Sequence, residues 1–488
     1  MQLTDLINNI HVIQVAGDVQ RKEISNIVYD SREVTKNSVF VAIKGYSTDG
    51  HKFILDAINK GADAIILEDD NVVPEEIFIH RNVTKILVKN SRIALAELSK
   101  GFFKDPSSKI VLAGVTGTNG KTTTTFLVKN IFDSLGVKAG LIGTIANYIG
   151  DEKIVSKLTT PESIEINKYL SEMINKDCRY CAMEVSSHSL SLNRTYGLNF
   201  KFAVFTNITI DHLDFHKTFD NYKNSKKMLF DQLSEDSIAI INSDDENSEF
   251  MINNCKGKVI RFGKKPDSDY LISNVEFNLQ ETSYNLTHNG EIYQINIPLI
   301  GEFNAFNSTA ALIVCHQSGF YLEEIIEVLK NVNQVPGRFE VIGKGNKKVI
   351  IDYAHTPDSL EKSIISLRKI IGDNKLITVF GCGGDRDKTK RPIMGKIATD
   401  LSDKVIITSD NPRTENPYSI IDDIVKGIIK SNYLIIEDRE EAIKKAIELG
   451  DNNAAILIAG KGHETYQIIN ETKLDFSDSK TARKYLGE

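Results

Sequence analysis

The sequence lacks the features of a disulfide-stabilised, membrane-inserted or nucleic-acid-binding protein. Its 5 cysteines are scattered along 488 residues, and Cys178 and Cys181 form an isolated CxxC pair, so we expect reduced thiols rather than a disulfide framework or a zinc site. No apolar run approaches the roughly 18 residues of a membrane span, and residues 1–7 lack the basic start and apolar core of a signal peptide. The net charge of -7 disfavours general binding to nucleic acid or membrane surfaces. We therefore expect a cytoplasmic protein with no nucleic-acid partner and no membrane insertion.

The length and composition indicate several globular domains. A chain of 488 residues is too long for one core, and about two to four domains are expected. With 41% hydrophobic and 26% charged residues, the composition is ordinary for a globular protein. Turn-forming residues at 102–108 and the Pro-Gly-Arg at 336–338 favour domain boundaries there. The expected domains are residues 1–105, 106–336 and 337–488.

A glycine turn between a predicted strand and a predicted helix carries the clearest chemistry. Residues 114–123 read GVTGTNGKTT; the apolar run at 110–115 predicts a buried strand, and residues 124–132 predict a helix. Backbone N–H groups in such a turn bind phosphate oxygens, Lys121 can neutralise the β- and γ-phosphates, and the Thr122 hydroxyl can bind Mg2+. The strict P-loop pattern has glycine where Val115 stands, so the match is partial. The context nevertheless predicts a nucleotide site.

Polar loops follow further strand-like runs along the chain. Residues 1–104 read as a small α/β unit without a catalytic group of its own, with strands at 38–43 and 64–67 around a helix at 53–60. Beyond it, strands and helices alternate, which predicts an α/β protein with mostly parallel sheets. In such sheets, ligands bind at the carboxyl ends of the strands. The runs that end in polar loops there are 180–185, 202–206, 349–352, 376–380, 404–408 and 455–459.

Eleven motifs lie in order along essentially the whole chain. They are DSR (30–32), TGTNGKT (116–122), TTP (159–161), EVSSH (184–188), NITIDHLD (207–214), GEFN (301–304), PGR (336–338), DYAH (352–355), GGDR (383–386), DNPR (410–413) and GKGHE (460–464). Together they resemble the Mur ligases, and within them the members that add the third residue of the muramoyl peptide. The family's phosphate turn also lacks the early glycine, which accounts for Val115. The resemblance implies an N-terminal domain for the UDP end of the substrate, a central P-loop ATPase domain with a parallel sheet, and a C-terminal Rossmann-like domain that brings the amino acid.

The resemblance also implies the reaction and its catalytic groups. ATP phosphorylates the side-chain carboxylate of D-Glu in UDP-MurNAc-L-Ala-D-Glu, the amine of meso-diaminopimelate attacks the acyl phosphate, and phosphate leaves; we expect a monomer. The implied catalytic residues are Lys121, Lys226, Glu184 and His212. The implied Mg2+ ligands are Thr122, Glu184, His212 and a carbamate formed from CO2 on Lys226, since an ammonium cannot bind Mg2+. Choosing Lys226 over Lys227 depends on aligning Tyr222 and Phe230.

The resemblance carries over two further groups of binding residues. For ATP they are Gly117, Thr118, Asn119, Gly120, Lys121, Thr122, Thr123, Asn304, Arg338, Asp352 and His355. The last four of these also have an ordinary interpretation as loop caps or rim charges. For the UDP-sugar peptide the residues are Ser31, Tyr46, Ser47, Thr48, Thr159, Thr160, Ser186 and Arg194. Leu158 and Leu192 stand where some members have Asn and Gln, so those polar contacts are absent.

The loop at 410–413 resembles that of the family members that add meso-diaminopimelate, whereas lysine-adding members usually carry another residue in place of Arg413. Diaminopimelate carries a second carboxylate at its far end, and the Arg413 guanidinium can pair with it at two points, whereas lysine would present an ammonium. The residues implied to bind diaminopimelate are Arg386, Asp410, Asn411, Pro412, Arg413, Gly460 and Glu464. The alternatives are a lysine-adding member, a folylpolyglutamate synthetase, a P-loop kinase or switch, and a binding protein on a decayed ligase fold.

Overall fold

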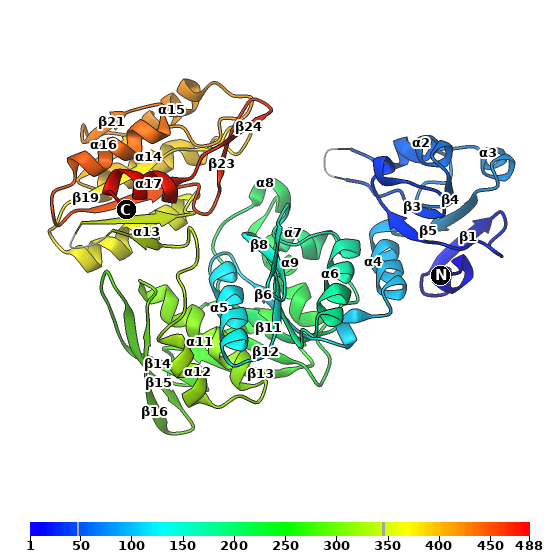
Figure 1. Cartoon of the computed structure of the whole chain (residues 1–488), viewed down its shortest axis with the longest axis horizontal. Coiled ribbons are helices and arrows are strands. Elements are labelled where there is room, and N and C mark those ends of the chain that lie inside the picture. Colours follow the sequence, from blue (N-terminus) through cyan, green and yellow to red (C-terminus); the bar gives the residue numbers. More distant parts are fainter. Residues whose placement is uncertain (46–47, 344–346) are drawn as a thin grey trace.

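The N-terminal sheet belongs to a small α/β unit at one end of the molecule, drawn in blue in Figure 1. The computed structural model describes residues 1–45, 48–343 and 347–488. The strands, in spatial order, are β1 (Val12–Ala16), β5 (Thr84–Val88), β4 (Ala62–Leu67), β3 (Ser38–Val41) and β2 (Asn26–Val28). β1 is antiparallel to β5 and the other pairs are parallel. The helices are α1 (Leu3–Ile7), α2 (Ile54–Asn59), α3 (Glu75–His80) and α4 (Ser91–Phe102), with 3-10 turns at Ser31–Glu33 and Gly50–Phe53.

The central sheet is the largest. Its strands, in spatial order, are β16 (Glu291–Ile297), β15 (Thr282–His288), β14 (Tyr270–Phe277), β13 (Lys258–Gly263), β12 (Ile238–Asn242), β11 (Phe200–Phe205), β6 (Val111–Thr116), β10 (Tyr180–Glu184), β7 (Ala139–Ile142), β8 (Ala146–Ile149) and β9 (Glu152–Val155). The pairs from β7 through β14 are parallel, and the two ends of the sheet are antiparallel. A 3-10 turn at Pro106–Ser108 precedes β6.

Helices cover both faces of this central sheet, because its strands bury apolar side chains on both sides. Along β6, Leu112 packs into one hydrophobic cluster and Ala113 into the other. The cluster with Ala113 includes residues of α5 (Lys121–Ser134), α11 (Glu302–His316) and α12 (Leu322–Leu329). The cluster with Leu112 includes residues of α6 (Ser163–Asn175), α7 (Ser187–Ser191), α9 (Phe219–Asp231) and α10 (Ser248–Ile252). The short α8 (Leu213–His216) lies in the loop before α9.

The C-terminal sheet forms the third α/β unit, coloured from yellow to red in Figure 1. Its strands, in spatial order, are β17 (Glu340–Ile342), β18 (Lys348–Asp352), β22 (Ala455–Ala459), β19 (Leu376–Phe380), β20 (Lys404–Ile407) and β21 (Tyr433–Ile435), and only the β17–β18 pair is antiparallel. A separate hairpin joins β23 (Tyr466–Ile469) and β24 (Thr472–Asp475). One face packs against α13 (Pro357–Ile371), α14 (Lys390–Leu401) and α15 (Pro417–Val425), and the other against α16 (Arg439–Leu449) and α17 (Asp478–Leu486).

The predicted α/β class is confirmed, and several elements differ in their bounds. The strands expected at 376–380 and 455–459 are β19 and β22 residue for residue. The helix expected at 53–60 is shorter, since residues 50–53 form a 3-10 turn before α2. The antiparallel strands at both ends of the central sheet were not expected. Neither expected boundary cuts a sheet, and the boundaries themselves remain predictions.

Two expectations from composition can be compared with the structure. All 5 cysteines are free thiols, as their scattered positions indicated. Within the described residues, none of the helices combines the length and the apolar character needed to cross a bilayer.

A fully buried ion pair ties together the helices and loops at the carboxyl edge of the C-terminal sheet. Arg439 and Asp478 are both 0% exposed, and the guanidinium meets the carboxylate at two points, each 2.7 Å long. Arg439 also donates to the backbone oxygens of Ala459 and Ser409, at 3.0 and 3.3 Å. One side chain therefore connects α16 and α17 with the last residue of β22 and with the loop that follows β20.

Replacing this arginine should destabilise the C-terminal unit. Arg439→Ala leaves Asp478 buried without its partner, so we expect a loss of about 3–5 kcal/mol in the free energy of unfolding. Lys484→Ala, which removes the exposed pair with Glu440, should cost less than about 1 kcal/mol. Urea unfolding followed by circular dichroism measures both. Equal stability of the two variants would contradict the role given to Arg439.

Candidate functional site

The glycine turn after β6 lies at the middle of the central sheet, between the ends of β10 and β11. Gly117 has a φ of +152°, and a Cβ atom there would lie 1.9 Å from the Thr206 hydroxyl oxygen. Gly120 has a φ of +87° and directly precedes α5. The backbone N–H groups of Thr118 and Asn119 donate to Asn207. The unpaired N–H groups of the first turn of α5 therefore remain the donors that suit a phosphate.

Two lysines converge on one carbonyl oxygen in this turn. Lys121 Nζ donates to the backbone oxygens of Gly117 and Thr118 at 2.8 and 3.0 Å, and Lys226 Nζ donates to Gly117 at 2.7 Å. Lys226 is 1% exposed. Burial, followed by repulsion from Lys121, lowers the pKa of Lys226 well below its ordinary value, and burial also lowers the pKa of Lys121. The neighbouring Lys227 instead pairs with Asp231.

A glutamate at the end of β10 faces the start of α5. Glu184 Oε2 accepts hydrogen bonds from the Thr122 hydroxyl at 2.9 Å and from the Thr144 hydroxyl at 3.0 Å. The Arg338 guanidinium, which belongs to the segment before β17, donates to the same Thr122 hydroxyl oxygen at 3.1 Å. Predicted residues from three separate motifs thus meet at one hydroxyl group.

A group of histidines lies beside the two lysines. His212 has a φ of +53°, and its Nε2 lies 3.5 Å from a carboxylate oxygen of Asp211. Its ring centre is 4.8 Å from that of His188. Burial lowers the pKa values of both histidines to about 4, so both rings are neutral near pH 7. Within the described residues, no cluster of three or more His, Cys, Asp or Glu could hold a metal ion.

The other residues expected to bind nucleotide are bonded mainly within their own loops. Asp352 accepts from the backbone N–H groups of Phe339 and Tyr353 and from the Ser363 hydroxyl. The His355 ring nitrogen Nδ1 lies 2.8 Å from the Tyr353 carbonyl oxygen. These contacts match the loop-cap interpretation for their side chains.

Asn304 reaches the glycine turn only through a neighbour that the sequence did not single out. Its Nδ2 donates to Ile300 O at 2.9 Å, and its Oδ1 accepts from Asn307 Nδ2 at 3.1 Å. The Asn307 Oδ1 atom would lie 2.4 Å from a Cβ placed on Gly120. Spacing along α11 signals this pair, because residues three apart share one face of a helix.

Asp358 is a second residue that motif reasoning passed over. It lies in the first turn of α13, and its Oδ2 accepts from Asn119 Nδ2 at 3.3 Å and from the Thr209 hydroxyl at 3.1 Å. The C-terminal unit therefore contacts the phosphate turn of the central unit directly. The polar loop that follows the predicted strand at 349–352 was the signal in the sequence.

The residues expected to bind a UDP-sugar peptide divide between two units. Thr159, Thr160, Ser186 and Arg194 lie together: the Thr160 hydroxyl accepts from the Ser186 N–H at 3.1 Å, and the Thr160 carbonyl accepts from Arg194 Nη1 at 3.1 Å. The Thr159 and Thr144 hydroxyl oxygens are 3.1 Å apart. Ser31 and Thr48 belong to the N-terminal unit, where Ser31 is buried. Tyr46 and Ser47 lie outside the described residues.

The loop at 410–413 packs against the loop at 460–464. Glu464 Oε2 accepts from Asn411 Nδ2 at 2.8 Å and from Lys461 Nζ at 3.0 Å. Lys461 is fully buried, and sequence reasoning gave it no role. Gly460 has a φ of +118°, and a Cβ there would lie 2.6 Å from an Asp410 carboxylate oxygen. The predicted glycine and acidic residues are thus in contact.

Two arginines border the opposite side of this loop. Arg413 has a φ of +51°, and its Nη1 donates to Gly384 O at 2.7 Å. A Cβ atom on Gly383 would lie 3.0 Å from Arg413 Nη1 and 3.8 Å from Arg386 Cγ. Arg386 is exposed and Arg413 partly exposed. Both guanidinium groups are therefore available near one glycine turn.

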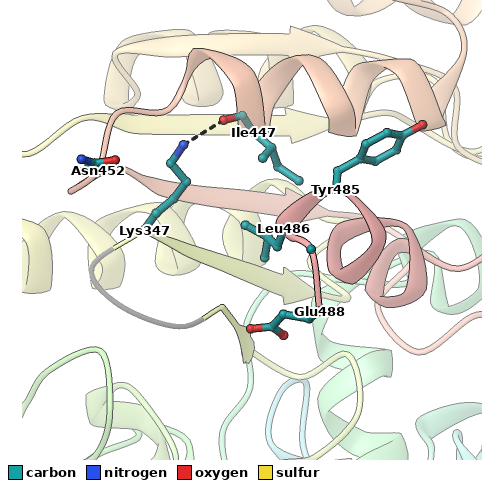
Figure 2. Close-up of a pocket in the computed structure, with 7 residues that line it drawn as sticks. Lys347, Ile447, Asn452, Tyr485, Leu486 and Glu488 are labelled. Atoms are coloured by element: carbon teal, nitrogen blue, oxygen red, sulfur yellow. Dashed lines mark hydrogen bonds between the residues drawn. The ribbon is translucent and has the colours of Figure 1, made fainter.

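A cavity elsewhere in the C-terminal unit includes none of these residues. It has a volume of about 360 Å³ and lies beside the end of α17. Figure 2 shows the Lys347 amine pointing to the Ile447 carbonyl oxygen, at 3.2 Å, on one side of it. Its lining is Lys347, Ile447, Asn452, Tyr485, Leu486, Gly487 and Glu488. The candidate site is therefore not this cavity.

Family models match all three parts of the chain. The Mur ligase family, catalytic domain matches residues 23–103, the Mur ligase middle domain matches 115–315, and the Mur ligase, glutamate ligase domain matches 337–462. The UDP-N-acetylmuramoyl-L-alanyl-D-glutamate--2,6-diaminopimelate ligase of Clostridium tetani is 46% identical, with 100% of each chain covered. The protein of the same name from Clostridioides difficile is 42% identical, also with 100% of each chain covered.

Solved structures agree with these matches. A structure of a UDP-N-acetylmuramoyl-L-alanyl-D-glutamate--2,6-diaminopimelate ligase has a TM-score of 0.71 and 31% identity, covering 100% of this chain and 99% of that one. MurF ligase from Thermotoga maritima in complex with ADP has a TM-score of 0.63 at 20% identity, covering 96% and 98%, and shares the fold. Since the similarity extends over the full length of these relatives, the chain belongs to the Mur ligase family.

Proposed function

We propose that this protein is an ATP-dependent, amide-forming ligase that adds meso-diaminopimelate to the D-Glu side-chain carboxylate of UDP-MurNAc-L-Ala-D-Glu in peptidoglycan synthesis. It acts in the cytoplasm as a monomer. The relatives that carry the name of this activity are similar over their full length. The observation that carries the proposal is the meeting of Thr122, Glu184 and Arg338 at one hydroxyl group.

The site suits a reaction in which a carboxylate and a triphosphate must approach each other. Both are anions, so neutralising charge dominates the barrier. Lys121 lies at the phosphate turn and is placed to bind the β- and γ-phosphates once its bonds to the turn carbonyls are released. Arg338 adds a second cation from the C-terminal unit. ATP would lie along residues 117–123, with Asn304, Asp352 and His355 toward its base and ribose. The resemblance assigns Arg338 to that end too, but its bond to the Thr122 hydroxyl favours a place beside the phosphates.

The donor atoms at this position fit Mg2+. The Thr122 hydroxyl and the Glu184 carboxylate are hard oxygen donors 2.9 Å apart. His212 and a carbamate on Lys226 would complete the set. Bound Mg2+ would supply additional positive charge to the transferring phosphoryl group.

Lys226 is suited to carbamylation. A neutral amine is needed to attack CO2, and the C–N bond forms with loss of one amine proton. Burial and the adjacent Lys121 favour the neutral amine of Lys226, because both disfavour a second ammonium. Lys227, which pairs with Asp231, lacks these surroundings.

The loops of the C-terminal unit are suited to an amino acid with charges at both ends. Arg413, beside Gly384, would pair with the distal carboxylate of diaminopimelate. Glu464 would accept from the distal ammonium, after exchange of its present bonds to Asn411 and Lys461. Arg386 would bind the other end of the amino acid. Asp410, Asn411, Pro412 and Gly460 would shape the loop around the distal centre. The UDP-sugar peptide would contact Ser31, residues 46–48, Thr159, Thr160, Ser186 and Arg194.

The proposed activity predicts phosphate release that needs all three substrates. ATP, Mg2+ and UDP-MurNAc-L-Ala-D-Glu should release phosphate when meso-diaminopimelate is added, and L-lysine should support little release. Phosphate release with lysine but not with diaminopimelate would support a ligase and reject the role assigned to Arg413. If neither amino acid supports phosphate release, the folate-type and non-ligase alternatives become the better explanations.

Substituting Lys226 should abolish most activity without unfolding the protein. We expect Lys226→Ala to lower kcat by at least about 100-fold, since it removes a group that stabilises transition-state charge. Added formate or acetate should restore part of it by supplying a carboxylate. Lys227→Ala is the matched control and should keep wild-type kcat. Full activity of Lys226→Ala without rescue would exclude the carbamate.

Substituting Arg413 should separate amino-acid binding from nucleotide binding. We expect Arg413→Ala to raise the KM for diaminopimelate by roughly 30-fold or more, equivalent to about 2 kcal/mol or more for a lost charge pair. The KM for ATP should change less than about twofold. Steady-state kinetics with each substrate varied in turn measures both constants. An unchanged KM for diaminopimelate would reject the assignment.

A further inference from the structure

A single carboxylate joins two arginines where the N-terminal and central units meet. Glu162, at the start of α6, forms an ion pair with Arg194 through Oε1 at 2.8 Å and with Arg92 through Oε2 at 3.4 Å. Arg92 belongs to α4, which packs against α6 and lies beside it in Figure 1. Arg92 and Glu162 were not among the predicted site residues.

Each arginine also holds a backbone carbonyl next to a predicted binding segment. Arg92 donates through Nε and Nη2 to Lys44 O, at 3.3 and 3.1 Å. Lys44 pairs with Asp49 in the turn that carries Thr48 of the proposed UDP-sugar site. Arg194 donates through Nη1 to Thr160 O at 3.1 Å. The two halves of the proposed sugar-nucleotide site are therefore connected through Glu162 by charged groups.

Burial and charge make this arrangement different from a surface salt bridge. The side chains of Arg92 and Arg194 are each 13% exposed, and that of Glu162 is 9% exposed. Two guanidinium groups share one carboxylate, so the group retains one positive charge. Among the described residues, no hydrogen bond engages Nη2 of Arg194. That nitrogen can therefore bind an anionic or carbonyl oxygen of a ligand.

We propose that Glu162 and Arg92 are positioning residues for the sugar-nucleotide substrate. Glu162 orients the Arg194 guanidinium toward the substrate. Arg92 holds the Lys44 carbonyl at a fixed position relative to Arg194. Both ends of one long acidic ligand can then bind at the same time. This proposal rests on the proposed function, because it concerns the same substrate. It adds residues that contact no substrate atom themselves.

An electrostatic role and a positioning role for Glu162 predict opposite effects of Glu162→Gln on substrate binding. The substitution keeps the size of the side chain and removes its negative charge. If Glu162 acted only through its charge, an anionic substrate would bind more tightly after the substitution. If Glu162 positions Arg194, binding should weaken, because an amide cannot hold two guanidinium groups as a carboxylate does.

The chain offers a matched control on the same helix and at the same interface. Glu165 lies three residues further along α6, and its Oε1 accepts from the Tyr29 hydroxyl of the N-terminal unit at 3.0 Å. Glu165→Gln is the same chemical change, and within the described part of the chain no hydrogen bond or ion pair joins Glu165 to Arg92 or Arg194. A general weakening of the interface should affect both variants alike.

The test is calorimetric binding of UDP-MurNAc-L-Ala-D-Glu without ATP, together with steady-state kinetics. We expect Glu162→Gln to raise the Kd and the KM for this substrate by about tenfold, with the KM for ATP and kcat at saturation within about twofold. Arg92→Lys, which keeps the charge but loses the fork that spans Lys44 and Glu162, should behave similarly. Glu165→Gln should match the wild type.

The outcomes separate this proposal from the proposed function. Glu162→Gln that binds as tightly as the wild type, or more tightly, would overturn the positioning role while leaving the ligase intact. Equal losses in Glu162→Gln and Glu165→Gln would also overturn it, in favour of a structural interface. Failure of the wild-type protein to bind the sugar nucleotide would instead reject the proposed function.

Discussion

The carbonyl oxygen of Gly117 accepts hydrogen bonds from two amines, and most of the chemistry of the central unit depends on that arrangement. Two ammonium groups at one buried oxygen repel each other and lose hydration, so their surroundings favour a neutral amine at the more buried Lys226. The cost falls when an anion enters, because phosphate or carboxylate charge can then pair with the amines. The turn is therefore electrostatically suited to a ligand that carries several negative charges.

The order of the strands explains why this turn has such neighbours. β6 lies between β10 and β11, and all three are parallel, so their carboxyl ends open at one edge. That order brings Glu184 and the loop with His212 beside Lys121, although these residues are far apart in the sequence. In the C-terminal sheet, too, polar loops follow the carboxyl ends of parallel strands. The buried Arg439 donates hydrogen bonds to the backbone oxygens of Ser409 and Ala459 at this edge.

Much of this could be predicted from the sequence, and the limits have physical causes. Buried parallel strands such as β19 and β22 are continuous apolar runs, which composition alone reveals. At one end of the central sheet, β15 alternates in burial and the edge strand β16 lies largely at the surface, and their mixed residues resemble loops. Motifs identified Thr122 and Glu184 as site residues, but they do not show which way each side chain points. For Asp352, the motif identified the residue, whereas the structure shows that its carboxylate caps its own loop.

Residues that act between units were the hardest to find. Glu162 and Asp358 carry ordinary carboxylates beside known motifs, and only the packed structure shows that their partners are Arg92, Arg194, Asn119 and Thr209. A contact across two sheets leaves no periodicity in the sequence, because it depends on how separate units dock. Local sequence patterns therefore predict helices and strands better than they predict the contacts between separate units.

The contact of Asp358 with Asn119 and Thr209 has a thermodynamic consequence for the whole chain. A ligand that accepts hydrogen bonds from Asn119 and Thr209 would displace the Asp358 carboxylate. The first turn of α13 would then lose this contact with the phosphate turn. Occupancy of the phosphate turn and the orientation of the C-terminal unit are then linked equilibria, and linkage is reciprocal. A ligand that stabilises one orientation of the C-terminal unit would therefore change the affinity of the phosphate turn for its own ligand, and that second ligand would change the affinity of the first by the same factor.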